Sequence, residues 1–104
     1  MANGSAAFAT DTVFAAVADP TRRRMLEVLR SEECSVREIT DVVDVSQSAV
    51  SQHLKVLKDA GFVSIRPEGT RNIYYINKQK LDELRAFWTN HWSVLLASLN
   101  EQED

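Results

Sequence analysis

Residues 35–63, SVREITDVVDVSQSAVSQHLKVLKDAGFV, contain two short amphipathic patterns that follow each other with only residues 44–46 between them. Ser35 and Glu38 have the spacing of a capping box, which predicts the start of a short first helix. Its buried face is expected to consist of Ile39, Val42 and Val43. Two helices joined so tightly must cross and pack on each other, which is the geometry of a helix-turn-helix.

The second helix has a recognisable start, a recognisable end and two different faces. Ser46 is expected to cap its first turn, and Gly61 stands where a left-handed C-terminal stop is needed. The inward face is formed by the apolar residues Val50, Leu54 and Leu57. The opposite, outward face carries Ser48, Ser51, Gln52 and Lys55.

After Gly61 the hydrophobic period changes from 3.6 to 2, which indicates strands. The segments FVSIR and RNIYYI predict two strands, and PEGT between them supplies Pro67 and Gly69 for a turn. The expected product is a β-hairpin whose tip is flanked by Arg66 and Arg71.

Helices are expected on both sides of this unit. Asp19 and Pro20 form a cap and first-turn proline for a helix over about residues 20–30, and a shorter helix is expected near residues 11–17. Asn77 is expected to cap a long last helix from Lys78. Its apolar stripe consists of Leu81, Leu84, Trp88, Trp92, Leu95 and Leu99, with Phe87 and His91 beside it.

The order of elements predicts a mainly α fold with a β-hairpin wing, a winged helix-turn-helix, as a single domain over residues 1–104. The chain of 104 residues is 44% apolar, enough for a modest core, and the stripe on the last helix is too long for that core to cover. We therefore expect a homodimer. No signal peptide or membrane span is recognisable, so a cytoplasmic protein is expected.

The distribution of charge favours a nucleic-acid partner although the net charge is −3. Residues 46–80 carry six basic and two acidic side chains, whereas the acidic excess lies before and after them. Because salt screens charges beyond roughly 10 Å, the local basic field decides whether phosphates are attracted.

The outward face of the second helix suits the major groove, which admits an α-helix. The small Ser48 and Ser51 would allow a close approach, Gln52 can pair with an adenine edge, and Lys55 with a phosphate or guanine. A polar face that is merely solvated is the plain alternative, and a winged-helix module for protein contact without DNA binding is the other. An enzyme is not expected, because acids, bases and nucleophiles fall on separate elements and the sequence has no glycine-rich phosphate loop.

ADPTRRRMLEVLR, SVREI and VSQSAVSQHLKVLKDAGFVSIRPEGTRNIYYIN closely resemble the ArsR/SmtB family of bacterial transcriptional repressors over about residues 8–100. DPTRRR and FWTNHW are similar to its metal-independent autorepressor (SdpR-like) branch. The resemblance implies a homodimer, joined through the first and last helices, that binds an operator palindrome in double-stranded DNA and represses transcription. The implied DNA-binding residues are Gln47, Ser48, Ser51, Gln52, His53, Lys55, Arg66, Thr70 and Arg71. The implied dimer interface comprises Phe14, Leu84, Trp88, His91, Trp92, Leu95 and Leu99.

Many relatives release DNA when a metal binds, but neither of their metal sites is complete in this chain. The helix before the recognition helix lacks the Cys-x-Cys pair that a soft metal needs, and Cys34 precedes it alone. The other site of these relatives uses an Asp-x-His and a later His-x-x-Glu on the last helix. Here His91 would be the first histidine, but Thr89 stands in place of the aspartate and Gln102 in place of the second histidine. We therefore expect no metal and no cofactor, while an unidentified effector stays open.

Several residues allow two interpretations. His53 either contacts a phosphate or fills space beside Leu57, and His91 is expected in the dimer seam rather than on a ligand. Trp88 and Trp92 are expected in core or interface, with an effector pocket as the alternative. The arginine triplet at residues 22–24 begins a helix, where the dipole disfavours cations, so it is expected to contact phosphate or a neighbouring acidic end. Cys34 is expected to be an ordinary cysteine, with a redox switch as the alternative, because the neighbouring Glu32 and Glu33 make its thiol a weaker nucleophile.

Overall fold

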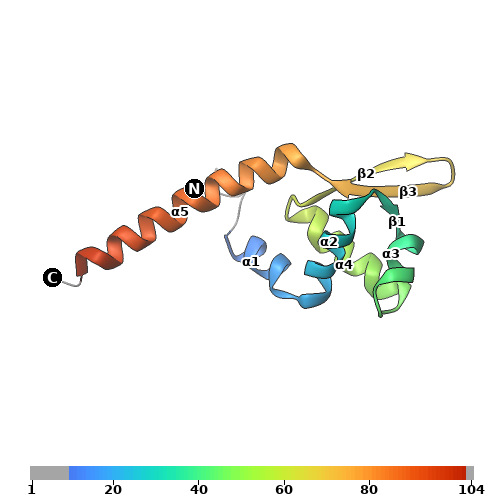
Figure 1. The fold of residues 1–104 in the computed structure, drawn as a ribbon, viewed down its shortest axis with the longest axis horizontal. Helices are drawn as coiled ribbons and strands as arrows, with labels where there is room; N and C mark the ends of the chain where they lie inside the picture. The colour runs from blue at the N-terminus through green and yellow to red at the C-terminus, as the bar shows by residue number, and fades with distance from the viewer. Residues whose placement is uncertain (1–9, 103–104) are drawn as a thin grey trace.

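The structure, a computed structural model, describes residues 10–102 as five helices and three short strands. In chain order these are α1 (Thr10–Ala18), α2 (Pro20–Ser31), β1 (Cys34–Ser35), α3 (Val36–Val42), α4 (Gln47–Asp59), β2 (Val63–Glu68), β3 (Arg71–Ile76) and α5 (Lys78–Gln102). The body is formed by α1 to α4 under the β-sheet, and α5 leaves it as an arm (Figure 1). The predicted winged helix-turn-helix is confirmed.

The helix-turn-helix begins and ends where its capping residues predict. The capping box of α3 is complete, since the Ser35 backbone N–H donates to Glu38 Oε1 at 2.8 Å and the Glu38 N–H donates to Ser35 Oγ at 3.2 Å. The Ala49 N–H donates to Ser46 Oγ at 3.1 Å and fixes the start of α4. These local hydrogen bonds hold the turn between α3 and α4 short.

Gly61 ends α4 in the left-handed conformation, with φ +92°. The Gly61 N–H donates to the Lys58 carbonyl at 3.0 Å and the Phe62 N–H to the Leu57 carbonyl at 2.9 Å. Both bonds occupy carbonyls that the end of the helix leaves without partners. The predicted stop is confirmed, and it turns the chain directly into β2.

The core lies where α2, α3 and α4 meet below the sheet. Its largest fully buried side chains are Met25, Ile39, Val50, Leu54 and Leu57. The prediction that Val42 joins this core is wrong, because half of Val42 is exposed to solvent. α3 ends at Val42, and the backbone of Val43 is extended. The helical period therefore no longer applies at Val43, which is buried while Val42 is exposed.

The sheet has one more strand than predicted. Its order is β1-β3-β2, and the two-residue β1 pairs antiparallel with β3 through Cys34 opposite Tyr74 and Ser35 opposite Ile73. The predicted hairpin is present, but its turn is only Gly69 and Thr70, because the residues on either side of that pair still belong to the ladder.

Pro67, expected in the turn, lies in β2. The strand tolerates it because β2 is an edge strand, where one backbone donor is dispensable. Gly69 alone supplies the positive φ of the turn, at +65°. The two strands therefore extend almost to the tip of the wing, and Arg71 is placed next to the turn.

α5 gives the molecule its elongated shape. Asn77 caps it as predicted, since the Lys80 N–H donates to Asn77 Oδ1 at 3.0 Å. The molecule measures 58 × 27 × 24 Å and its radius of gyration is 16.2 Å, whereas a compact chain of this length has a radius of about 13 Å. The far half of α5 extends beyond the body (Figure 1). Within residues 10–102, no helix is both long and apolar enough to cross a membrane.

Acid should weaken the fold partly through Asp19, the cap of α2. Its carboxylate accepts hydrogen bonds from the backbone N–H groups of Arg22 and Thr21, which hold the pKa of Asp19 below its ordinary value of 3.8. A lowered folded pKa stabilises the fold above pH 3.8, and this stabilisation is lost as the pH falls from there through the folded value. Asp19→Asn keeps a capping oxygen but no charge.

We expect the urea midpoint of Asp19→Asn to fall less than that of the wild type between pH 7 and pH 3, and the two to converge in acid. Parallel curves for the two proteins would show that the charge of Asp19 contributes nothing to stability.

Candidate nucleic-acid interface

One face of α4 gathers five of the predicted DNA-binding residues on the surface of the molecule. Gln47, Ser48, Ser51, Gln52 and Lys55 are all exposed, while the opposite face of α4 is in the core. Lys55 Nζ is 3.0 Å from Asp59 Oδ2, one helical turn on, and both side chains are more than half exposed. Because exposed ion pairs of this kind are weak, a phosphate can replace Asp59 as the partner of Lys55.

His53 lies at the edge of this face and is half-buried. Its Nδ1 is 3.0 Å from Nη1 of Arg22, on α2. His53 therefore does more than fill space beside Leu57, because its ring has a specific polar partner in Arg22. That His53 also contacts DNA stays a prediction.

The arginines at residues 22 and 23 cap the end of α1. Arg22 donates from Nε to the Ala16 carbonyl at 2.8 Å and from Nη2 to the Ala15 carbonyl at 2.7 Å. Arg23 Nη1 donates to the carbonyls of Val17 and Ala18 at 2.8 and 3.0 Å. Within residues 10–102 no ion pair joins either arginine to a carboxylate, and the negative C-terminal end of α1 is their partner instead. Contact of these arginines with phosphate stays a prediction.

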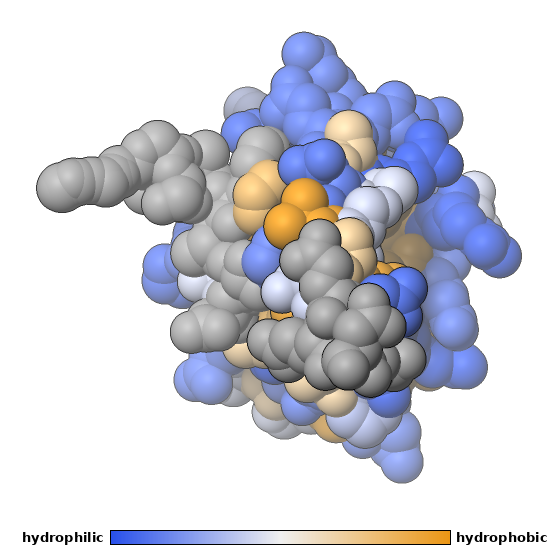
Figure 2. Space-filling view, turned by 90° about the vertical axis from the view of Figure 1, so that its left-hand side faces the viewer, coloured by the Kyte–Doolittle hydropathy of each residue, from blue (hydrophilic) through white to orange (hydrophobic). Residues whose placement is uncertain are grey.

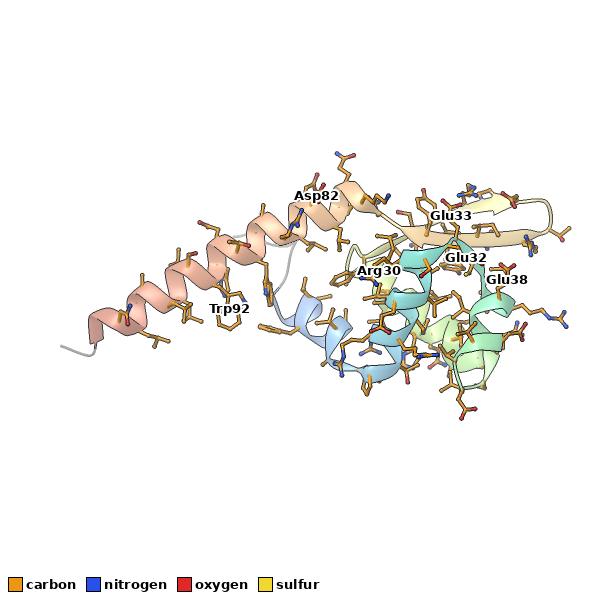
Figure 3. The ribbon with its side chains drawn as sticks, viewed as in Figure 1. Arg30, Glu32, Glu33, Glu38, Asp82 and Trp92 are labelled. Atoms are coloured by element: carbon orange, nitrogen blue, oxygen red, sulfur yellow. The ribbon has the colours of Figure 1, made fainter. Side chains whose placement is uncertain are left out.

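The wing arginines are held by carboxylates that sequence reasoning missed. Arg66 Nη2 is 2.6 Å from Glu33 Oε1 and 3.3 Å from Glu68 Oε2, and its guanidinium lies 5.6 Å from the centre of the Tyr75 ring. The hydrogen bond to Glu33 raises the pKa of Arg66 above its usual range. The guanidinium of Arg66 is therefore held beside the strand by Glu33 and Glu68, and Arg66 does not flank the tip of the wing as predicted. Figure 3 shows Glu33 beside the sheet, away from the tip of the wing.

Thr70 and Arg71 are exposed at the tip of the wing. Arg71 is only loosely paired, with its Nη2 3.9 Å from Glu68 Oε1. Of the two predicted wing cations, Arg71 therefore forms the weaker ion pairs within the protein. The position after the turn could identify Arg71 from sequence, but Glu33 is far from Arg66 along the chain and gave no signal.

Three of the predicted dimer residues, Phe14, Trp88 and Trp92, form an aromatic cluster between α1 and α5. The Phe14 ring centre lies 4.5 Å from that of Trp88 and 6.4 Å from that of Trp92, both edge to face. Figure 3 shows Trp92 projecting from α5 on the side that faces α1. His91 is exposed and its ring is stacked 6.1 Å from Phe87.

An exposed apolar surface continues along α5 beyond this cluster. The cluster contributes Phe14 and Trp92 to this surface, and the helix after it adds Val94, Leu95, Leu96 and Leu99. Figure 2 looks at the molecule from this end and shows hydrophobic residues together in the middle of the face, with hydrophilic residues around them. Leu84 differs from the other predicted interface residues, because it is only 5% exposed and belongs to the core of the chain.

A hollow of about 490 Å³ lies between α1 and the first half of α5. Trp88 lines it together with Val13, Val17, Phe62, Leu81 and Leu84, and Asp82 and Arg85 complete the lining. Trp92 is not among these residues, so the two tryptophans do not share the hollow.

Cys34 is buried in β1, and its Sγ–H donates to the Glu32 carbonyl at 3.4 Å. Burial, and then the negative charges of Glu38 and Glu32, raise the pKa of the Cys34 thiol. A raised pKa and burial both make the thiol a poor nucleophile. Within residues 10–102, no three His, Cys, Asp or Glu side chains are close enough to hold a metal ion together.

Comparison with known proteins gives a consistent result. Residues 19–64 match the model of the family described as bacterial regulatory protein, arsR family. The HTH-type transcriptional regulator Rv2034 of Mycobacterium tuberculosis is 45% identical to this chain over 83 residues, which are 76% of this chain and 78% of that protein. The transcriptional repressor SdpR of Bacillus subtilis is 32% identical over 70% of this chain and 81% of its own.

Among solved structures, one described as a possible transcriptional regulator for arsenical resistance superposes with a TM-score of 0.68 at 36% identity. The match covers 84% of this chain and 95% of that one. The family match includes the whole helix-turn-helix, so both the sequence and the fold of the candidate interface have relatives among transcriptional regulators.

Proposed function

The chain belongs to the arsR family of bacterial regulatory proteins and is a DNA-binding transcriptional regulator, not an enzyme; on this basis we propose that it is a repressor that binds an inverted-repeat operator as a homodimer. The observation that supports the proposal most strongly is the division of α4 into a fully buried apolar face and an exposed polar face. How DNA is read, how the dimer forms and whether a metal is needed each follow from separate residues.

DNA is read by α4 in the major groove. Ser48 and Ser51 are short enough to let the helix approach the base edges, and the Gln52 amide can form two hydrogen bonds with an adenine. Lys55, whose present partner is an exposed carboxylate, moves to a phosphate or a guanine. Gln47 and His53 lie beside these residues on the same helix.

The wing adds electrostatic contact from Thr70 and Arg71 at the tip. Arg66, with Glu33 and Glu68 around it, contributes less positive field than its charge alone would. The wing therefore contributes affinity that depends on salt, whereas α4 contributes selectivity between sequences.

The dimer is formed by α1 and α5 of both protomers. Along the far half of α5 the apolar side chains stay exposed, although Trp92 also contacts Phe14 of α1. Phe14, Trp92, Leu95 and Leu99 are the residues proposed for the seam, with Trp88 and His91 at its border; Leu84 supports the seam from within the core. Two-fold symmetry then sets the recognition helices about 34 Å apart, so half-site centres lie about 10 base pairs apart or at a multiple of that.

Repression is proposed to be independent of metal, as in the SdpR-like branch. The thiol of Cys34 is buried, and within residues 10–102 it is the free cysteine that a soft metal would have to use alone. His91 is stacked on Phe87, and in the same part of the chain no ion pair joins it to a carboxylate.

The rival function is a winged helix that binds only proteins. The two are separated by the salt dependence of DNA affinity, because displacement of counterions from DNA makes true DNA binding fall steeply as salt rises.

Gln52→Ala and Arg71→Ala should weaken DNA binding in different ways. Loss of the Gln52 amide should cost about 1–3 kcal/mol on the operator and leave binding to a scrambled duplex almost unchanged. Loss of Arg71 should weaken both duplexes alike and lower the salt slope by about 1 for each phosphate that Arg71 neutralises. Fluorescence anisotropy at several salt concentrations measures both, and equal weakening of both duplexes by Gln52→Ala would mean that α4 does not read bases.

Leu95→Glu should convert the dimer into monomers, because it places a charge in the proposed apolar seam. Sedimentation should show the change in mass, and operator binding should fall with it. Glu83→Gln, an exposed position on the first half of α5, is the matched control and should leave the dimer intact. A folded monomeric wild type that still binds the operator would refute this part of the proposal.

Zinc, cadmium or arsenite at stoichiometric concentration should change operator affinity by no more than about twofold, a shift under about 0.5 kcal/mol. A fluorescence titration of the protein on its operator with each ion measures this. If an ion released the DNA and its removal restored binding, Cys34 or His91 would have to be a ligand after all.

A further inference from the structure

The arginine triplet at residues 22–24 has no role in DNA binding in the function proposed above. Arg22 differs from its neighbour Arg23, because it contacts two helices other than its own. Nε and Nη2 of Arg22 cap α1 at Ala16 and Ala15, while Nη1 lies 3.0 Å from Nδ1 of His53 on α4. A single planar group thus joins the end of α1 to the recognition helix.

The chemistry of this contact determines where the hydrogen of His53 lies. A guanidinium has five N–H donors and no acceptor, so Nδ1 of His53 must accept the hydrogen bond from Arg22. A ring nitrogen that accepts carries no hydrogen, and the single N–H of the neutral imidazole is therefore on Nε2. Protonation of Nδ1 would place two donors and two positive charges face to face at 3.0 Å.

The other charge next to this pair is Asp19, the cap of α2. The backbone N–H groups of Arg22 and Thr21 lower the pKa of Asp19 most, and the positive charges of His53, when it is protonated, and of Arg22 add to the effect. Both N–H groups donate to the same carboxylate oxygen of Asp19, Oδ1, that of Arg22 at 3.1 Å and that of Thr21 at 2.7 Å. Among the hydrogen bonds within residues 10–102, the one that reaches the imidazole of His53 joins it to Arg22.

We propose that Arg22 is a positioning residue for DNA binding, which fixes His53 as a neutral donor with its N–H at Nε2, directed to a phosphate oxygen of the operator. This inference rests on the proposed function, because it needs α4 in the groove. His53 adjoins Gln52 on α4 and is half-buried, so a neutral N–H donor there reaches the backbone while Gln52 reads a base.

The same contact ties α1 to α4. Because α1 belongs to the proposed dimer seam, Arg22 connects the surface that joins two protomers to the surface that reads DNA. A purely structural role for Arg22, as a cap of α1, predicts no effect on the ring of His53 and no effect on DNA affinity beyond lost stability.

Arg23 provides the matched control. It caps the same end of α1, and its guanidinium donates to the carbonyls of Val17 and Ala18 rather than to His53. Arg22→Met and Arg23→Met each remove one positive charge and a set of capping bonds from α1. Only Arg22→Met releases Nδ1 of His53.

The experiment combines nitrogen-15 NMR of the histidine ring with anisotropy on the operator, using the full chain. In the wild type near pH 7.5, we expect His53 as the Nε2–H tautomer, and in Arg22→Met a mixture of tautomers. Operator affinity should fall about fivefold more in Arg22→Met than in Arg23→Met. His53→Gln, whose amide nitrogen lies near the position of Nε2, should keep more affinity than His53→Asn, whose amide lies near Nδ1.

An Nδ1–H tautomer in the wild type, or equal affinity losses in the two methionine variants, would overturn the role of Arg22. If Arg22→Met failed to fold, the wild-type tautomer and the comparison of His53→Gln with His53→Asn would still decide. A wild type with the Nε2–H tautomer but no sequence-specific DNA binding would instead defeat the proposed function, and the positioning role with it.

Discussion

Burial of the apolar face of α4 determines which side chains the helix presents to a partner. Val50, Leu54 and Leu57 are fully buried against the neighbouring helices, and each such side chain contributes roughly 1.5–3 kcal/mol on transfer from water. A rotation of α4 about its axis would expose them and bury serines and glutamines without partners. Burial of the apolar face of α4 therefore fixes which polar face is exposed to solvent. A helix that binds in a DNA groove needs such a rigid polar surface.

The net charge of −3 does not show how charge is distributed around the exposed face of α4. The acidic excess of the chain lies outside residues 46–80. One of these acidic residues, Glu33, lies beside the wing in the fold and forms an ion pair with Arg66. Exposed ion pairs contribute little to stability, so their importance lies in where they place a cation and how much of its field remains for a partner. Lys55 on α4 and Arg71 at the tip of the wing have exposed side chains, so their charges are accessible to a partner beside the recognition surface.

Features that depend on neighbours in sequence could be predicted from the sequence. The capping box of Ser35 and Glu38, the cap at Ser46 and the stop at Gly61 each require only a few consecutive residues, and the structure confirms all three. The features that the sequence did not predict depend instead on residues that are far apart along the chain. β1 exists because β3 passes beside it, and Arg22 meets His53 across 31 positions of the chain. No periodicity or spacing encodes such contacts. Leu84 shows a related limit, because a helical stripe shows which residues are apolar and not whether the chain itself or a second chain covers them, and within the chain Leu84 is already buried.

The proposed function requires that two copies of the outward face of α4 read a specific, symmetric DNA sequence. This requirement is tested by incubating the purified protein with fragments of the genome it comes from, recovering the bound DNA at physiological salt and sequencing it. We expect one enriched motif, an inverted repeat with half-site centres about 10 base pairs apart or at a multiple of that. Recovery of fragments without a common motif, or of a single half-site without its inverted partner, would contradict the proposed function.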